Sequence, residues 1–171
     1  VPAQPRHVAI AASGAALPAG PHGPARPVEA TDVVGWVRAI GDCIGVELGV
    51  EAAQREPFHP GRCVAISVPG GDVVGHAGEL HPKVCSRLEL PERTVAAELD
   101  LDAIVAASGE PVKPGQLSTQ PVANTDVALV VDEGVPAAAV AAALRSGAGD
   151  DLESLTLFDV YRGDQVGEGR K

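Results

Sequence analysis

Aromatic residues and positive charge are both scarce in this chain of 171 residues. It has two Phe, one Tyr, one Trp and no Met, so a core must be made mainly of Val, Ala, Leu and Ile. Thirteen Lys and Arg stand against 23 Asp and Glu, a formal net charge of -10. A protein that binds nucleic acid by itself draws most of its affinity from cationic contacts to phosphates. The charge therefore argues against an autonomous DNA or RNA binder, but not against one RNA-facing module of a larger assembly.

Long hydrophobic runs and paired cysteines are also missing. No apolar run approaches the roughly 20 residues of a membrane span, and the N-terminus lacks the basic and then hydrophobic order of a secretory signal. Cys43, Cys63 and Cys85 form no CxxC pair, so reduced and buried thiols are expected. These features predict a cytoplasmic protein with no membrane partner. The Val1 start and the ending at residues 167–171 predict a piece of a longer protein.

No familiar catalytic or phosphate-binding motif occurs. GxxxxGK[ST], GxGxxG and GxSxG are all absent. Glu79 is interpreted as a solvated hairpin carboxylate rather than half of an acid/base pair with His76. A metal site of His59, His76 and His81 is an alternative, but His76 and His81 would point to opposite faces of one strand. His59 and His81 each precede a proline, which favours roles in turns. We therefore expect no catalytic, cofactor-binding or metal-binding residue.

Hydrophobic periodicity predicts a strand over residues 6–12, a surface loop over 13–27, and then a helix. Thr31 or Asp32 offers the N-cap. Apolar residues then recur every three or four positions up to a stop at Gly49; they are Val33, Val37, Ile40, Ile44 and Leu48. Three glycines interrupt this helix at 35, 41 and 45, each costing roughly 1 kcal/mol relative to Ala. Either a neighbour packs closely there, or the helix is weaker than its pattern suggests.

The middle of the chain predicts a β-hairpin. Arg62–Val68 and Val73–Leu80 have strand character and are joined by Pro-Gly-Gly-Asp. A short helix is expected over Lys83–Arg87, followed by a strand over Val95–Leu101. A helix near residues 102–107, with Asp100 and Asp102 as caps, completes this part. Pro111, Pro114 and Gly115 then mark a linker.

A second unit is expected after the linker. Asp126–Val131 is a continuous apolar strand of the fully buried kind. Pro136 suits the first turn of a helix over Ala137–Arg145, in which Arg145 lies at the negative end and Gly147 stops the helix. Leu152–Arg162 is predicted to be a long strand.

Two stretches carry a family resemblance. Residues 58–62 read FHPGR, and residues 74–82 read VGHAGELHP. Together they resemble the signature of a synthetase-like module in the β subunits of bacterial phenylalanyl-tRNA synthetases. Glycines at such positions allow a close approach of backbone, and Arg62 suits a buried ion pair or a partner contact. The signature residues with an expected structural role are His59, Pro60, Gly61, Arg62, Gly75, Gly78, His81 and Pro82.

The second stretch resembles the start of the ferredoxin-fold anticodon-binding domain of the same subunit. Residues 121–131, the helix 136–146 and the Leu157–Gly163 sequence LFDVYRG follow the family order. Family members often have Arg where this chain has Thr125, which puts any RNA or interface contact of that arginine in doubt.

The resemblance implies an α+β fold in two parts. Residues 1–113 would be the C-terminal part of a catalytically silent, antiparallel-sheet, class II synthetase-like module. Residues 116–171 would be the first half of the ferredoxin-like domain. In this family an α subunit activates phenylalanine with ATP and Mg²⁺, and two α and two β chains assemble. The implied partners are therefore the α subunit and the tRNA for phenylalanine, and the chain itself would hold no cofactor.

Two further expectations follow from that resemblance. The ferredoxin-like sheet has the order 4-1-3-2, so the strands at 126–131 and 152–162 would lack the neighbour between them and be marginally stable. RNA contact would fall on Tyr161, Arg162, Arg170 and Lys171. A free-standing interaction module with no part in aminoacylation is the alternative function.

Overall fold

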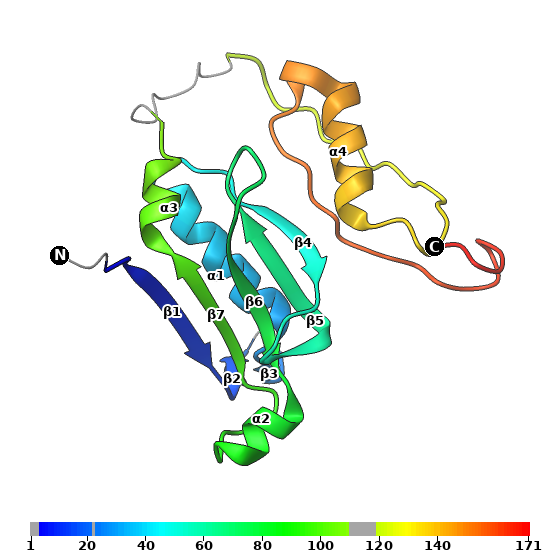
Figure 1. Cartoon of the computed structure of the whole chain (residues 1–171). Coiled ribbons are helices and arrows are strands. Elements are labelled where there is room, and N and C mark those ends of the chain that lie inside the picture. The colour runs from blue at the N-terminus through cyan, green and yellow to red at the C-terminus, as the bar shows by residue number, and fades with distance from the viewer. Residues whose placement is uncertain (1–3, 22, 110–118) are drawn as a thin grey trace. The chain divides into compact units, whose positions relative to one another are not determined.

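The computed structural model describes residues 4–21, 23–109 and 119–171. The chain divides into two compact units, Val1–Gly115 and Gln116–Lys171 (Figure 1). The predicted linker residues Pro111, Pro114 and Gly115 lie outside the described residues.

The first unit is built on a five-stranded antiparallel sheet with the order β1-β7-β6-β5-β4. The strands are β1 His7–Ala12, β4 Gly49–Ala53, β5 Phe58–Ser67, β6 Val73–Leu80 and β7 Val95–Asp100. The predicted first strand, the hairpin and the strand near residue 95 are confirmed. β4 was not predicted, because its sequence GVEAA has no alternation of apolar and polar residues.

The core lies on one face of this sheet. Successive side chains of a strand point to opposite faces, and α1 (Ala30–Cys43) packs against β6 and β7 on the core side (Figure 1). The largest fully buried side chains come from these strands, α1 and α3 (Leu101–Ala106). They are Ile66, Leu99, Ile104, Val33, Val37 and Val95. β-branched and Leu side chains thus fill the main core, and Phe58 is buried in a smaller cluster with Cys63, Leu80 and Cys85.

α1 begins earlier than the sequence predicted. Its N-cap is Glu29, and Asp32 accepts a hydrogen bond from the Glu29 backbone N–H at 2.8 Å, which completes a capping box. Asp32 also binds Arg26 through two hydrogen bonds of 2.9 and 2.7 Å. The Arg26 guanidinium, with the Glu29 backbone N–H, lowers the pKa of Asp32 to about 2. The carboxylate therefore stays charged, and the cap intact, until the pH falls well below 4.

α1 also ends earlier, at Cys43 instead of near Leu48. Gly45 has a φ of +71°, a left-handed conformation that ends helices and that glycine adopts readily. The chain then turns back, so that a Cβ at Gly41 would collide with the Val46 carbonyl oxygen. The predicted close neighbour is therefore found at Gly41, where it is this returning segment, whose Val46 and Leu48 side chains are buried in the core. At Gly35 the prediction of a close neighbour is wrong, because a Cβ there would meet nothing within 4 Å.

Shorter elements complete the first unit. The predicted loop over 13–27 contains a small two-stranded sheet, β2 Ala15–Leu17 and β3 Arg26–Pro27. α2 (Pro82–Arg87) and α3 confirm two predicted helices. Asp100 caps α3 as predicted, accepting from the Ala103 N–H at 2.9 Å, whereas Asp102 binds Arg6 instead. That bond lowers the pKa of Asp102.

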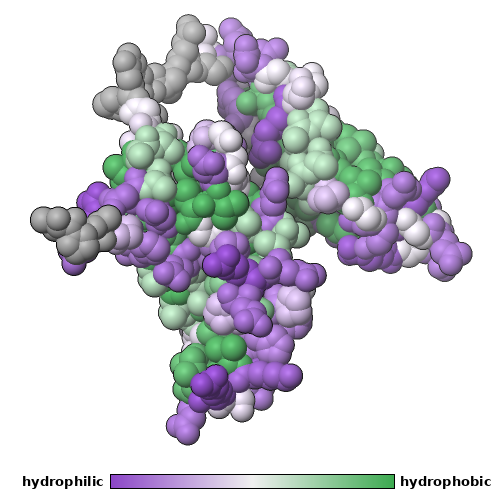
Figure 2. All heavy atoms as spheres, in the orientation of Figure 1, coloured by the Kyte–Doolittle hydropathy of each residue, from purple (hydrophilic) through white to green (hydrophobic). Residues whose placement is uncertain are grey.

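The second unit contains helix but, in residues 119–171, no strand. α4 (Ala137–Ala148) confirms the predicted helix, which ends at Gly149 rather than Gly147 and is followed by the 3-10 turn η1 (Gly149–Asp151). The prediction of strands at 126–131 and 152–162 is wrong, because neither segment forms a strand in this structure. Figure 2 shows hydrophobic side chains open on the surface of this unit.

The absence of these strands has a physical cause. A strand is stable only when its backbone groups pair with a neighbour. In the ferredoxin-like topology the first two strands flank a third strand and do not touch each other. Among residues 119–171, segment 126–131 has only a short partner at its end, where Val131 and Lys171 exchange two backbone hydrogen bonds of 3.0 Å.

Two glycine substitutions test the packing of the first unit. A Cβ at Gly75 would collide with the Glu98 carbonyl oxygen and lie 2.9 Å from the Leu99 Cα. We expect Gly75→Ala to lower the free energy of unfolding by about 1–3 kcal/mol, since β6 and β7 would have to separate. Gly35→Ala, at an exposed helix position with nothing within 4 Å, should raise it by up to about 1 kcal/mol. Urea denaturation followed by circular dichroism measures both, and equal effects would contradict the close approach.

Candidate functional site

A bulge interrupts the pairing of β5 with β6. Phe58 pairs with Leu80 and Cys63 with Gly78, so the four residues 59–62 of β5 lie opposite Glu79 alone. We call residues 59–62 together with Glu79 the hairpin bulge. The sequence stretches FHPGR and VGHAGELHP are therefore two sides of one structural feature. Bulges of this kind re-aim side chains at a sheet margin.

Gly78 allows the hairpin bulge to form. A Cβ there would collide with the Arg62 carbonyl oxygen and lie 2.9 Å from the Cys63 Cα. The bulged backbone of β5 therefore passes directly against β6. Gly75 has the same role toward β7 on the other side of the strand. The structure thus places both signature glycines at close backbone approaches.

The two signature histidines fix turns. The Nδ1 atom of His59 accepts the Gly61 N–H at 3.1 Å, and the Nδ1 atom of His81 accepts the Lys83 N–H at 3.1 Å. The second bond caps α2, whose first residue is Pro82. Their rings lie side by side, with centroids 6.3 Å apart. The predicted hydrogen-bonding role of both histidines in turns is confirmed. Pro60, which follows His59 in the bulge, is exposed.

The structure does not assemble the alternative metal site. Within the described ranges, no three His, Cys, Asp or Glu side chains are grouped so that they could hold a metal ion. His76 lies in β6, where burial and then the charge of Arg55 lower the pKa of its imidazole. Burial likewise raises the pKa of the Cys63 thiol. Cys63 and Cys85 are buried as predicted, but Cys43 is exposed.

Glu79 is buried and paired, which corrects its interpretation as a solvated carboxylate. The residue is 3% exposed, and its Oε1 accepts a hydrogen bond from Arg62 Nη1 at 2.7 Å. Its Oε2 lies 3.6 Å from Arg93 Nε and has no hydrogen-bond partner. Arg93 in turn lies 3.8 Å from Glu29, the N-cap of α1. This row of alternating charges joins the hairpin to the start of the helix.

This row of charged side chains has a structural role. A general acid or base must reach a substrate proton, whereas Glu79 is enclosed between two strands. Arg62 keeps 48% of its side chain exposed, so it confirms the predicted ion pair and remains open to a partner. The sequence did not single out Arg93 or Glu29. Arg93 adopts a left-handed φ of +59° in a turn, and no residue pattern marks that position in advance.

The second unit gathers the three basic RNA-facing candidates around one acidic pair. Arg162 Nε lies 2.9 Å from Glu133 Oε1, and Lys171 Nζ donates to the Glu133 carbonyl oxygen at 2.7 Å. Arg170 lies 4.0 Å from Asp132. Tyr161 is 50% exposed. Asp132 and Glu133 were not predicted from the sequence as partners of these basic residues. Their position directly after the apolar stretch was the signal that could have indicated this role.

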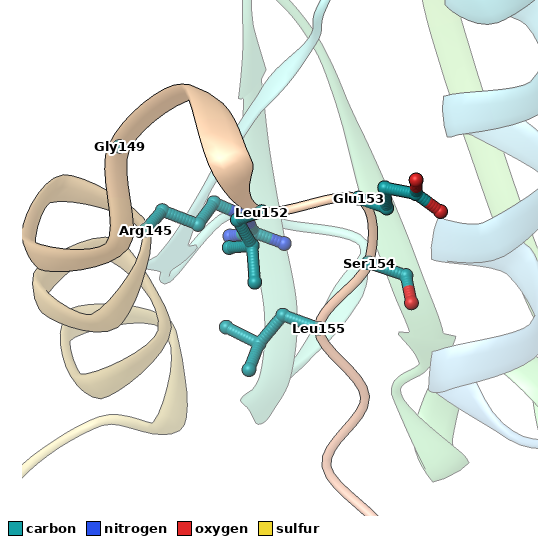
Figure 3. A pocket seen from close by; sticks show the side chains of 6 residues that line it. All are labelled: Arg145, Gly149, Leu152, Glu153, Ser154 and Leu155. Atoms are coloured by element: carbon teal, nitrogen blue, oxygen red, sulfur yellow. The ribbon is translucent and has the colours of Figure 1, made fainter. Parts of the chain in front are cut away.

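A shallow hollow of about 280 Å³ lies beside the end of α4 (Figure 3). Arg145, Leu152 and Leu155 face one another there, whereas Glu153 and Ser154 extend to the other side of the chain. A ligand pocket usually combines an enclosed apolar surface with a few converging polar groups. This hollow has one cationic side chain and no buried wall, so we assign it no ligand.

The sheet face opposite α1 carries small side chains. Across the strands, Ala9 pairs with Glu98, Glu98 with His76, and His76 with Ala65. Neither α1 nor α3 covers this face, because their buried side chains join the core on the other side. At one end of this face, Cys63 and Leu80 pack with Cys85 of α2, whereas Ala9 is exposed.

Comparison with known proteins agrees with this architecture. Residues 1–101 match the family described as the phenylalanyl tRNA synthetase beta chain CLM domain, and residues 118–171 match the ferredoxin-fold anticodon binding domain. The whole chain is 53% identical over 174 residues to the phenylalanine–tRNA ligase beta subunit of Thermobifida fusca. It is 51% identical to that of Streptomyces avermitilis and 48% identical to that of Corynebacterium jeikeium. The chain spans about a fifth of the length of these relatives, 20–21%.

Removal of Arg62 tests the structural role of its ion pair with Glu79. Arg62→Ala would leave a buried carboxylate without its hydrogen-bond donor, and we expect a loss of about 1–3 kcal/mol in the free energy of unfolding. Arg6→Ala is the matched control, because it breaks an ion pair with Asp102 in which both side chains are largely exposed. It should have a clearly smaller effect in the same urea denaturation. Equal losses of unfolding free energy in the two variants would show that burial of the Glu79 carboxylate does not depend on its bond to Arg62.

Proposed function

Because the chain belongs to the phenylalanyl-tRNA synthetase β-chain family, we propose that it is a scaffold of that ligase and not its catalytic centre. It would support the ATP- and Mg²⁺-dependent attachment of phenylalanine to tRNA through contacts with the α subunit and with the tRNA. The observation that carries this proposal is the similarity over all of its residues to β subunits of the ligase. The assembly would be cytoplasmic, with two α and two β chains.

We assign the first unit to a silent class II synthetase-like module. Its antiparallel sheet with helices packed on one face suits such a module. The hairpin bulge uses the signature residues for backbone packing, turn capping and an ion pair, which are structural roles. In the part of the chain that the structure describes, no helix is long and apolar enough to cross a membrane.

The open sheet face is our candidate for the contact with the α subunit. Small side chains let a partner approach closely, and flat apolar patches mark protein interfaces. The cross-strand row there runs Ala9, Glu98, His76, Ala65 and Glu51, so each of the two alanines lies beside a glutamate. The exposed guanidinium of Arg62 offers a further polar contact.

The tRNA contact is assigned to Tyr161, Arg162, Arg170 and Lys171. Support comes from the convergence of the three basic residues on Asp132 and Glu133. Exposed ion pairs of this kind contribute at most about 1 kcal/mol, so a phosphate can displace the carboxylates. The Tyr161 side chain is half-exposed, and we assign it the stacking contact with a base.

The alternative is a free-standing interaction module that binds a protein partner without aiding aminoacylation. The same open face would serve it. It predicts a stable monomer that is indifferent to the α subunit, so one binding measurement separates the two functions.

Co-purification with the α subunit of the same organism's ligase is the first test. We expect a tagged α subunit to retain the wild-type chain, and Ala9→Arg to weaken retention because the new side chain blocks the open face. Ala106→Arg, an exposed alanine on α3, is the control and should be retained like wild type. A wild-type chain that does not bind would support the alternative. Activation of phenylalanine by the chain without the α subunit would contradict the scaffold role.

Binding of the complex to tRNA is the second test. Arg162→Ala should weaken binding and reduce the slope of log K against log salt by about one, because one phosphate contact is lost. Glu133→Gln should have the opposite effect, since it releases Arg162. Arg145→Ala, which removes the same charge at the end of α4, is the control. If Arg145→Ala and Arg162→Ala weaken binding equally, the RNA-facing assignment is wrong.

A further inference from the structure

The two signature histidines each use one ring nitrogen and leave the other open. The Nδ1 atoms of His59 and His81 accept backbone N–H groups, from Gly61 and Lys83, at 3.1 Å. A backbone N–H can only donate, so each accepting Nδ1 carries no proton, and the proton of a neutral ring lies on Nε2. In the part of the chain that the structure describes, neither Nε2 has a hydrogen-bond partner. Each half-buried ring therefore presents an unused N–H donor.

This tautomer decides what the pair of rings can bind. A metal ion binds a ring nitrogen through its lone pair. Here the lone pair of Nδ1 already accepts a backbone N–H, and Nε2 is protonated, so neither ring is free to bind a metal. The rings lie side by side with centroids 6.3 Å apart, which brings both N–H donors within reach of one small acceptor.

Arg62 adds an anchored positive charge beside these donors. It lies in the same bulge as His59, and its Nη1 donates to Oε1 of Glu79, which precedes His81 by two residues. Because Glu79 is buried, this bond holds the guanidinium from the interior, while 48% of the Arg62 side chain stays exposed. The other guanidinium N–H groups have no partner among the described residues. A cation held in place loses little rotamer freedom when it binds an anion.

The net charge of the group suits a carboxylate better than a phosphate. The charges of Arg62 and Arg93 are balanced by Glu79 and Glu29, which lie within 3.8 Å of them. The phosphates of RNA are bound through several uncompensated cations, which this group lacks. A carboxylate carries one negative charge, and its two oxygens accept several N–H donors.

Exposed leucines beside α2 indicate that the carboxylate belongs to a polypeptide. His81 is the N-cap of α2 and Leu88 is its C-cap, roughly 10 Å away along the helix axis. The Leu88 side chain is 60% exposed and that of Leu90 is 37% exposed. Over α2, at the bottom of Figure 2, hydrophobic surface lies among hydrophilic side chains. An apolar contact next to a polar rim is the usual composition of a protein interface.

We propose that His59, His81 and Arg62 form a binding site for the side-chain carboxylate of a protein partner. The two Nε2–H groups and the exposed edge of the guanidinium donate to its oxygens. Leu88 and Leu90 receive an apolar side chain that lies beside the carboxylate in the partner. The inference rests on the hydrogen bonds of the hairpin bulge and not on the proposed function.

Solution NMR of the full chain tests the donors and the ligand together. Nitrogen-15 spectra of His59 and His81 should show the ring proton on Nε2 and none on Nδ1. The probe is the blocked peptide acetyl-Glu-Ala-Leu-amide, and the matched control is the same peptide with Gln in place of Glu. At millimolar concentration we expect the Glu peptide to shift the Nε2–H and Arg62 guanidinium signals saturably. The Gln peptide should bind at least roughly tenfold more weakly, because hydrogen bonds to a charged acceptor are stronger.

Asparagine at either histidine removes the donor but keeps the turn. The Asn side-chain oxygen accepts the same backbone N–H as Nδ1, whereas the Nε2–H is lost. His59→Asn and His81→Asn should each weaken binding of the Glu peptide about tenfold. His7→Asn is the control, because His7 is a partly exposed histidine on β1, and it should bind like wild type. Thermal unfolding like that of wild type shows that the variants are folded.

Four results would overturn the proposal. The first is a ring proton on Nδ1 of either histidine in the wild-type chain. The second is a Glu peptide that gives no saturable shift, or that shifts these signals no more than the Gln peptide does. The third is inorganic phosphate that binds more tightly than the Glu peptide, which would make this a phosphate site. The fourth is equal weakening by His7→Asn and the two bulge variants.

Discussion

The first unit depends on how closely β6 is packed between its two neighbours. Gly75 lets the backbone of β7 approach on one side, and Gly78 lets the bulged backbone of β5 approach on the other. Because both contacts are to main-chain atoms, no side-chain adjustment can relieve an added methyl group. Two glycines three positions apart thus allow three strands to lie at this close spacing. The core residues Ala77 and Leu99 lie on the strands that are held in this way.

The same strand carries the buried charge. Glu79 follows Gly78, and the bulge that Gly78 permits brings Arg62 within 2.7 Å of its carboxylate. Burying a carboxylate is costly unless a partner compensates it, so a hairpin in another register would leave Glu79 without Arg62. Arg93 and Glu29 extend the row of charges to the N-terminus of α1. The pair therefore favours one strand register and one helix placement, in addition to whatever stability it contributes.

Local chemistry could be predicted from the sequence, and long-range neighbours could not. The Pro-Gly-Gly-Asp turn identified the hairpin, and the Pro that follows each histidine indicated its role in a turn. The start of α1 was misplaced because Thr31 and Asp32 are both good caps by residue type, whereas Asp32 acts from inside the helix on Glu29. The burial of Glu79 was missed for another reason. Its partner Arg62 lies in a bulge, and a bulge shifts register without leaving a mark in the pattern of apolar residues.

The second unit shows the same distinction between local and non-local structure. α4 forms because each helical hydrogen bond joins residues four positions apart, and its Ala-rich sequence favours the helix without a partner. The segments at 126–131 and 152–162 have equally apolar sequences, yet they remain extended coil. A strand obtains its hydrogen bonds only from a neighbouring strand, and these two segments are not neighbours in the ferredoxin-like order. Apolar character therefore predicts that a segment will be buried, while the presence of an adjacent strand decides whether it becomes part of a sheet.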